Sequence, residues 1–348
     1  QYTVCRIPTV CWFPAKKLVL NIEFRKKRLL NGVAVGVFNQ YSDNCFRVCD
    51  HSEQLLNPTF WSELVEYSER FFGVSRHTNT TGCHAVDSEN IRVTCVMPIL
   101  FNHQCTDDAI SSVLQQSRRV DHLMLLVDHC ETTVTSTHLS IIEDRLDQSD
   151  ISFSIYRFQG INGPYRMLNQ VLEKHDDTDF LWLHDSDDIS HSTRLEKQLR
   201  YALYHKLDIC GTFEIRLATD RVQAIQFPIN VTRALRVEPG HCMLWPSSLI
   251  KRSLWRKLQG CSDVYTFGAD TEFQLRACFV ARMANIPSFL YARRVRPESL
   301  TGCTLTGHGS SLRGYVNSIY KAEYYKRKMA VDRGSEITFE PYFKFKQS

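Results

Sequence analysis

The chain has 348 residues, of which 43% are hydrophobic and 23% are charged. This composition is typical of a globular protein and excludes a disordered, collagen-like or coiled-coil chain. The 42 basic and 38 acidic residues leave a formal net charge of +4, which is too near balance to indicate nucleic-acid binding. No uninterrupted apolar run approaches the roughly 18 to 20 residues of a membrane-spanning helix.

The 13 cysteines are an odd number and show no Cys-x-x-Cys spacing. We therefore expect most of them to be reduced core residues, and we expect neither a zinc site nor a disulfide framework. Reduced cysteines favour a cytoplasmic location, although Asn-x-Ser/Thr triplets at Asn79 and Asn230 keep a lumenal one open. The basic cluster Arg25-Lys26-Lys27-Arg28 is either a solvated surface or a peripheral contact with an anionic membrane.

The first 90 residues divide into an N-terminal region and a linker. Apolar side chains at helical spacing predict a helix from Phe60 to Phe72. The stretch from Ser75 to Asn90 is rich in Ser, Thr, Asn and Gly, as linkers and long loops are. We therefore predict a small N-terminal accessory region at 1–75 and a linker at 76–90.

From Ile91 onward, strand and helix patterns alternate. The predicted strands are Ile91–Ile99, His122–Val127, Ile151–Arg157 and Phe180–His184, and the helices between them are Asp107–Gln116, Leu139–Leu146 and Tyr165–Lys174. Units of this length predict an α/β fold with a mostly parallel central sheet and helices on both faces. Such sheets bind ligands beyond the carboxyl ends of their strands. Polar residues follow all four strands here, so we expect them to converge on one edge.

The fourth strand runs directly into the acidic segment Asp185-Ser186-Asp187-Asp188. Side chains alternate along an extended segment, so Asp185 and Asp187 are expected to project to the same side. Unpaired carboxylates this close would repel each other, and a bound Mg²⁺ or Mn²⁺ with a diphosphate would remove the conflict. Alternatively, the segment is a surface turn whose Asp residues cap the next helix, near Thr193. Taken alone, the cluster does not decide between these interpretations.

Several segments in the same order make the stretch from Val93 to Gln198 resemble the family 2 glycosyltransferases. They are Val96-Met97-Pro98 with Phe101-Asn102, Asp108–Gln116, Leu125–Asp128, Gly163 with Asn169, and Asp185–Asp188 followed by Arg194-Leu195-Glu196-Lys197-Gln198. Five ordered matches are far more specific than any single one. The sequence departs from the family pattern at Phe101, where Tyr is usual, and at His129, where a second Asp is usual.

The resemblance implies a GT-A fold and metal-dependent, inverting transfer of a sugar from a nucleotide-diphosphate donor, usually a UDP-sugar. The acceptor would be a saccharide or a lipid-linked molecule, as in polysaccharide or glycoconjugate synthesis. The rest of the chain would then divide into a nucleotide-sugar-binding half at 91–205, an acceptor-binding half at 206–300, and a C-terminal lid loop and helix at 301–348.

Carried over by position, the resemblance also implies a set of binding residues. The nucleotide-sugar site would comprise Pro98, Asn102, Asp128, Gly163, Asn169, Asp185 and Asp187. Asp128 would accept a hydrogen bond from the base, Asp185 would lie near the ribose, and Asp187 would ligate Mn²⁺ or Mg²⁺, with Asp185 as its companion. Asp188 would be either a carboxylate behind the metal ligands or a helix cap.

A second acidic segment, from Gly268 to Arg276, resembles the part of the family pattern that holds the catalytic base. Asp270 would remove the proton of the acceptor hydroxyl, and it would lie at a helix start, where a negative charge is favoured. A role as a simple helix cap is the alternative, and Glu272 is the reserve base. His241 is a further candidate for contact with the acceptor or diphosphate, with a core histidine as the alternative. His308 is a candidate for contact with the metal or the diphosphate, with an exposed loop histidine as the alternative.

Two other functions compete with sugar transfer. A nucleotidyltransferase would also use clustered Asp residues and Mg²⁺, but its Gly-rich basic loop is not seen in the residues after the first strand, 99–106. A degenerate transferase domain that only binds a saccharide or a protein would not need Asp185, Asp187 and Asp270 together. Glycosyl transfer is therefore the function that the sequence favours.

Overall fold

The computed structural model describes residues 9–11, 18–20, 45–49, 58–74, 90–99, 103–128, 133–160, 162–175, 177–218, 222–296, 299–307 and 309–345. Among the sequence predictions, Asn102, His308, the basic cluster at 25–28 and the linker up to residue 89 lie outside the described residues.

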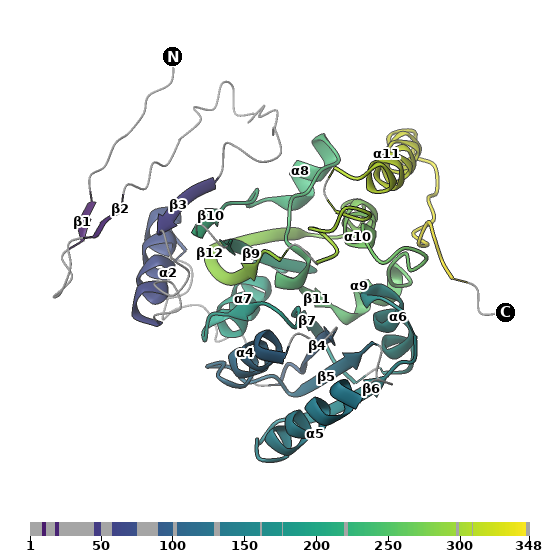
Figure 1. Ribbon diagram of the computed structural model, residues 1–348. Coiled ribbons are helices and arrows are strands. Elements are labelled where there is room, and N and C mark those ends of the chain that lie inside the picture. The colour runs from purple at the N-terminus through teal and green to yellow at the C-terminus, as the bar shows by residue number, and fades with distance from the viewer. Residues whose placement is uncertain are drawn as a thin grey trace.

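Four parallel strands form one half of the central sheet (Figure 1). They are β4 (Val93–Ile99), β5 (His122–Val127), β6 (Ser152–Arg157) and β7 (Phe180–Leu183), in the spatial order β7-β4-β5-β6. Helices α4 (His103–Leu114), α5 (Thr133–Asp147) and α6 (Pro164–Lys174) connect them. The predicted elements are confirmed here, with ends that differ by a few residues.

Apolar side chains of these strands point alternately into two cores. In β5, Leu123, Leu125 and Val127 pack with α4 and α5, whereas Met124 and Leu126 pack with α6. A strand that is buried on both faces reads as a continuous apolar run, as the sequence of β5 does. The prediction of an α/β fold with helices on both faces of the sheet is therefore confirmed.

The other half of the sheet is mixed. It contains β3 (Cys45–Cys49), β8 (Ile189–Ser190), β9 (Ile209–Leu217), β10 (Val222–Ile225), β11 (Leu249–Lys251) and β12 (Met283–Arg294). Strand β12 runs parallel to β9 and antiparallel to the short β8, so it reaches the end of β7 from the acceptor-binding half predicted at 206–300. The sequence did not predict these pairings.

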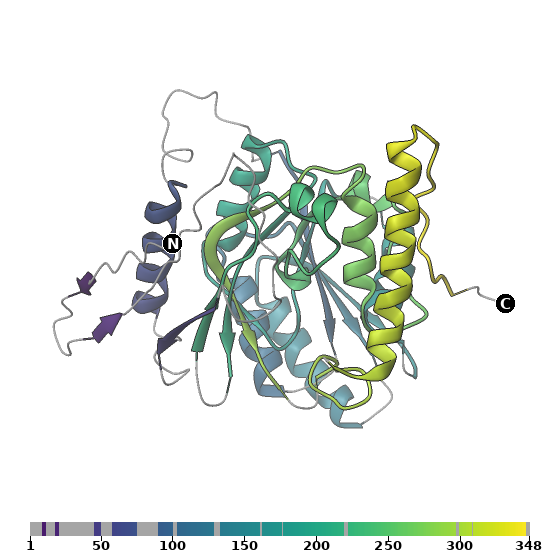
Figure 2. The same cartoon turned by 90° about the horizontal axis from the view of Figure 1, so that it is seen from above.

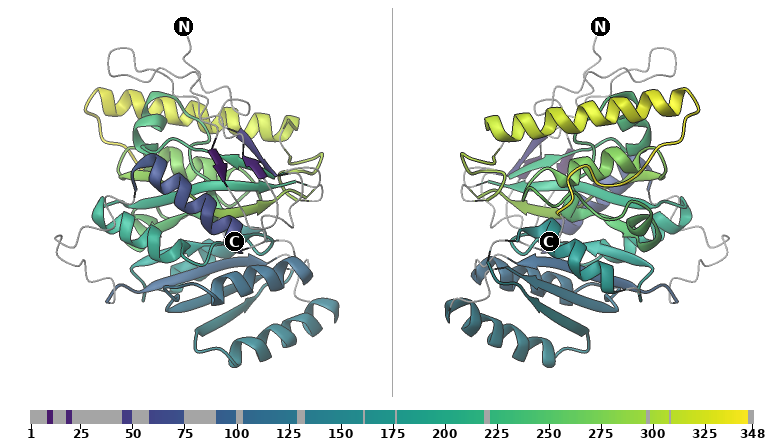
Figure 3. Two further views of the ribbon diagram at one scale, coloured as in Figure 1. Left: turned by 90° about the vertical axis from the view of Figure 1, so that its left-hand side faces the viewer. Right: turned by 90° about the vertical axis from the view of Figure 1, so that its right-hand side faces the viewer.

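The remaining helices cover the sheet from the outside (Figure 2). They are α2 (Pro58–Phe72), α7 (Arg194–Tyr204), α8 (Val231–Val237), the 3₁₀ turn η1 (Trp245–Ser247), α9 (Arg252–Lys257), α10 (Ala269–Ala277) and α11 (Ser311–Asp332). Figure 3 shows α11 along one side of the molecule and α5 along the opposite side. None of the helices in the described ranges has the length and apolar character that spanning a membrane requires.

The segment predicted as an N-terminal accessory region contributes to the main sheet. Strand β3 pairs with β10, and Trp61 Nε1 on α2 donates a hydrogen bond to the carbonyl of Phe289 on β12 at 2.7 Å. A separate hairpin pairs β1 (Thr9–Cys11) with β2 (Leu18–Leu20). The domain boundaries themselves stay predictions.

Candidate active site

The acidic loop from His184 to Asp188 follows β7 at the carboxyl edge of the parallel strands. The His184 backbone N–H donates to the carbonyl of Val96 on β4 at 3.2 Å, and its Nδ1 lies 2.7 Å from the carbonyl of Asp185. Burial, together with the charge of Arg194, lowers the pKa of His184 to about 3. The ring is therefore neutral at pH 7, and it orients the loop without adding a positive charge.

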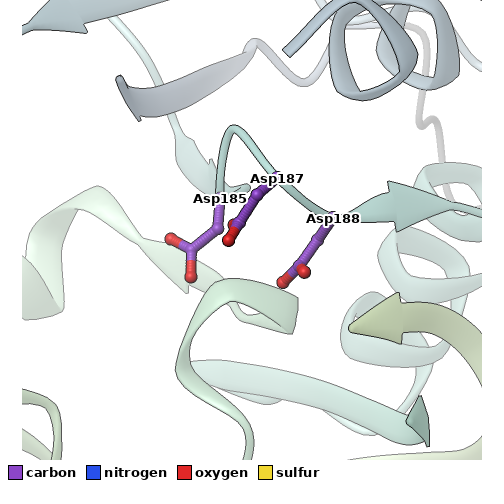
Figure 4. Close-up of side chains that lie close together, drawn as sticks. All are labelled: Asp185, Asp187 and Asp188. Atoms are coloured by element: carbon purple, nitrogen blue, oxygen red, sulfur yellow. The ribbon is translucent and has the colours of Figure 1, made fainter. Parts of the chain in front are cut away.

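Three carboxylates leave this loop in the same direction (Figure 4). One oxygen each from Asp185, Asp187 and Asp188 lie within 4.8 Å of one another. Burial, and next the charge of Asp187, raises the pKa of Asp185 to about 7, and the same causes raise the pKa of Asp188 well above its usual range. The Oδ2 atom of Asp188 is buried and has no hydrogen-bond partner among the described residues. The cluster thus has an excess of negative charge, which suits a hard divalent cation.

Two arginines at the end of β12 contact the acidic loop. The Arg294 backbone N–H donates to Asp188 Oδ1 at 2.9 Å, and its Nη1 donates to the carbonyl of Asp187 at 3.0 Å. Arg296 donates from Nε and Nη2 to Asp187 Oδ2, at 2.9 and 2.5 Å. Arg294 therefore holds the backbone of the loop, whereas Arg296 neutralises a carboxylate in it.

The buried Arg194 and Gln198 support the acidic loop from inside the protein. Arg194 donates from Nη2 to the carbonyl of Leu183 at 3.0 Å and from Nη1 to Ser190 Oγ at 2.8 Å, so it joins both ends of the loop. Gln198 Oε1 accepts from Trp182 Nε1 at 3.0 Å. The Arg-Leu-x-x-Gln part of the family pattern therefore has a structural role here.

Asp270 is the second residue of α10 and is partly exposed, next to the acidic loop. Its charge contributes to the raised pKa values of Asp185 and of the buried Tyr165, after the larger effect of burial in each case. Gly268, which precedes the helix, has φ +79°. Asp270 therefore lies within electrostatic range of the acidic loop, at the N-terminal end of α10.

Asp128 is buried at the end of β5, and its carboxylate binds the loop before α6. It accepts from the backbone N–H of Asn162 at 3.0 Å and of Gly163 at 2.8 Å, and from Asn162 Nδ2 at 3.1 Å. Gly163 has φ +74°, and a Cβ there would lie 2.6 Å from Thr266 Cγ2. Asp128 thus holds Gly163 by a hydrogen bond, and Gly163 in turn packs closely against Thr266, which lies four residues before Asp270.

Two other predicted residues are bound within the protein. Asn169 Nδ2 donates to the Cys261 carbonyl at 2.8 Å and to Asp263 at 2.9 Å, so it fixes the segment that leads to α10. Glu272 is buried and accepts from Nε and Nη2 of Arg276 at 2.6 and 2.8 Å. As placed, Glu272 serves an internal ion pair, which leaves Asp270 as the acid that faces the cluster.

Pro98 and His241 are the remaining predicted site residues in the described part of the chain. Pro98 is partly exposed near the end of β4, where it pairs in register with Leu126 of β5. His241 is exposed, yet the surrounding protein lowers its pKa by desolvation, against the opposing charges of Asp270 and Glu214. His241 is therefore close enough to Asp270 to share its electrostatic environment.

Sequence reasoning missed the roles of Arg294, Arg296 and Glu214. Glu214 on β9 is fully buried between Arg216 and Arg293, whose Nε atoms donate to it at 2.9 and 2.8 Å. The sequence feature that could have indicated these roles is the basic run Arg293-Arg294-Val295-Arg296, which follows a long apolar stretch. Their contacts depend on the parallel pairing of β9 and β12, which local patterns do not reveal.

Comparisons with known proteins complete the description of the site. The family model described as glycosyltransferase like family 2 matches residues 93–318, about two thirds of the chain. No curated protein matches the sequence.

Two similar solved structures are S. aureus TarS 1–349 in complex with UDP and the mannosyltransferase PcManGT from Pyrobaculum calidifontis in complex with GDP-Man and Mn²⁺. TarS 1–349 is 15% identical with a TM-score of 0.46, over 69% of this chain and 72% of that one. PcManGT is 15% identical with a TM-score of 0.45, over 81% and 76%. From the family match over most of its length, this chain belongs to glycosyltransferase family 2 and is a glycosyltransferase with an α/β fold of the GT-A type.

Proposed function

We propose that the protein is an inverting glycosyltransferase that uses a nucleoside-diphosphate sugar, preferably a UDP-sugar, and requires Mn²⁺ or Mg²⁺. The acceptor is the hydroxyl group of a saccharide or lipid-linked molecule in polysaccharide or glycoconjugate synthesis. One observation carries this proposal: three clustered carboxylates with excess negative charge lie within electrostatic reach of a fourth acid, Asp270.

The residues present fit a divalent cation. Asp187 and Asp185 supply carboxylate oxygens, which are the ligands that Mg²⁺ and Mn²⁺ prefer. Within the part of the chain that the structure describes, the buried Oδ2 of Asp188 has no hydrogen-bond partner, and this side chain points the same way as Asp185 and Asp187, so a cation bound there would also compensate this carboxylate. When bound, the cation supplies stabilisation of the negative charge that gathers on the departing diphosphate.

Asp270 acts as the general base. It accepts the proton of the acceptor hydroxyl as that oxygen attacks the anomeric carbon, on the side opposite the diphosphate. The start of α10 stabilises its ionised form, and the cluster at Asp185 marks where the diphosphate lies. His241, which is exposed and interacts electrostatically with Asp270, is proposed to contact the acceptor.

The nucleotide lies over the carboxyl ends of β4 and β5. Asp128 holds the loop that contains Gly163 through four hydrogen bonds from Asn162 and Gly163, so a base N–H would have to share a carboxylate oxygen with one of these donors. Pro98 lies near the end of β4 at the same edge, and Asn102 stays a proposed contact from its position in the sequence alone. Asn169 contributes indirectly, by fixing the segment at Cys261 and Asp263.

A peripheral membrane contact is proposed for the outer face of α11. Residues 311–333 contain six basic and two acidic residues, a net charge of +4 that equals that of the whole chain. Tyr315, Tyr325 and Met329 are about half exposed on this helix. Basic helices with exposed aromatic residues bind anionic membrane surfaces. Sedimentation with phosphatidylserine vesicles tests this contact, and equal binding to neutral vesicles would contradict it.

A cytoplasmic location is likewise a proposal, supported by the seven free cysteines of the described side chains.

The enzymatic proposal is tested by turnover of a panel of nucleotide sugars, monitored by mass spectrometry with and without Mn²⁺. We expect one donor to be consumed only with metal, and both Asp187→Ala and Asp270→Asn to lose activity. Turnover without metal, or full activity of both variants, would contradict the mechanism. Ligand-induced thermal stabilisation without turnover would indicate a binding module, and release of pyrophosphate would indicate nucleotidyl transfer.

A further inference from the structure

Arg296 binds the carboxylate that the proposed function assigns to the metal. Both Nε and Nη2 donate to Oδ2 of Asp187, and the two side chains are 23% and 19% exposed. Arg296 therefore supplies the positive charge nearest to the acid that is expected to ligate a cation. Because the pair is partly exposed, the guanidinium can leave Asp187 without unfolding of the surrounding structure.

The fixed position of the acidic loop does not depend on this ion pair. Arg294 holds the loop through the carbonyl of Asp187 and the carboxylate of Asp188, and its own Nη2 is anchored to Asp108 at 2.5 Å. Arg194 fixes both ends of the loop from inside. The contact of Arg296 with the carboxylate of Asp187 thus adds charge compensation to a loop that is already positioned.

A guanidinium and a divalent cation on one carboxylate repel each other strongly, because both are positively charged and only a few ångströms apart. A diphosphate removes this conflict, since its several oxygens can accept from both Nε and Nη2, the two donors that converge on the single oxygen Oδ2 of Asp187 here. The group that competes with the metal in the absence of nucleotide would then support the nucleotide in its presence.

We propose that Arg296 couples metal binding to diphosphate binding: it occupies Asp187 in the free enzyme and transfers to the diphosphate when metal and nucleotide bind together. This inference rests on the proposed function and adds an order of binding to it. The free cation binds weakly, whereas the cation and the nucleotide together bind strongly. By thermodynamic linkage, removal of Arg296 strengthens binding of the free cation and weakens the mutual enhancement of cation and nucleotide.

The test measures the dissociation constant of Mn²⁺ by electron paramagnetic resonance, alone and with saturating UDP, and again with GDP. The variants are Arg296→Met, which keeps a long side chain without charge, and Arg70→Met, which removes the same charge from the exposed face of α2. For Arg296→Met we expect roughly 10-fold tighter binding of free Mn²⁺ and a roughly 10-fold smaller effect of UDP. Arg70→Met is expected to match the unmodified protein.

Other results would overturn the proposal. Unchanged or weaker binding of free Mn²⁺ by Arg296→Met, with the effect of UDP preserved, would assign Arg296 a purely structural role. If Arg296→Met fails to fold, Arg296→Gln replaces it with the same expected result, because Gln retains a hydrogen-bond donor without charge. Absence of Mn²⁺ binding by the unmodified protein even with UDP or GDP would instead refute metal dependence, and the proposed function would fail first.

Discussion

Two sets of buried or half-buried acids in this protein have different surroundings. Glu214 and Glu272 are each enclosed by arginine: Glu214 by Arg216 and Arg293, and Glu272 by Arg276. The loop of Asp185, Asp187 and Asp188 gathers three carboxylates, raises the pKa of two of them and leaves one oxygen without a partner.

This difference separates structural acids from functional ones. A fully buried ion pair such as Glu272 with Arg276 cannot lose one partner without leaving a buried charge, whereas the pair of Asp187 with Arg296 is partly exposed. An acidic cluster with excess charge costs stability, and proteins retain such strain where a ligand removes it. The comparison therefore supports the proposal that the chemistry takes place at the acidic loop and Asp270, and it assigns Glu272 to an internal ion pair.

The largest expected effect is on activity. Asp270→Asn removes the base while keeping the size of the side chain, so we expect kcat to fall by about 10²- to 10⁴-fold. Thermal denaturation is expected to show little change, because Asp270 is partly exposed. Asp332→Asn, at the exposed end of α11, is the matched control for loss of one charge. Retained activity of Asp270→Asn would show that another residue is the general base.

The next effect is on stability. Glu272→Gln leaves Arg276 charged and fully buried without its carboxylate, so the free energy of unfolding is expected to fall by about 3–5 kcal/mol. Urea denaturation measures this change. A loss below about 1 kcal/mol, combined with a large loss of activity, would reverse the assignment and make Glu272 a catalytic candidate.

The ion pairs of Glu214 make the stability of the protein depend on pH. Burial alone would raise its pKa, but Arg293 and Arg216 outweigh burial and lower the pKa from 4.5 to about 2. The stabilisation is therefore fully present above pH 4.5 and is lost as the pH falls through about 2. It amounts to roughly 3 kcal/mol at most. Acid denaturation followed by circular dichroism is expected to begin at higher pH in Glu214→Gln, and an unchanged acid transition would count against the ion-pair cluster.

The smallest effect concerns the loop held by Asp128. Gly163→Ala combines a positive φ with a close approach to Thr266, whereas Gly160→Ala has a similar φ of +68° and open space around it. We expect Gly163→Ala to cost about 1–3 kcal/mol, and Gly160→Ala to cost less. Equal losses in thermal stability would show that Thr266 does not press against this loop.

The parallel half of the fold could be predicted from the sequence because each strand and helix there has its own local pattern. The predicted limits of β5 are confirmed at both ends, and α6 begins one residue earlier than predicted. The acidic loop and the helix start at Asp270 could be predicted for the same reason.

The mixed half of the sheet could not be predicted, because its strands are paired over long distances. Ser190 pairs with Tyr291, more than a hundred residues further along the chain. The hydrogen bonds of Arg294 and Arg296 to the acidic loop span a similar sequence separation. Asp128 shows a related limit: its position after β5 could be predicted, but its use by the backbone of Asn162 and Gly163 could not.

The most direct test of the account is a crystal structure with Mn²⁺ and UDP, in which anomalous scattering locates the ion. We expect a peak within bonding distance of an oxygen of Asp187, with the diphosphate on its far side and Asp270 facing the open position where the sugar would lie. A peak at another site, or a diphosphate bound with no ion near Asp187, would contradict the central claim.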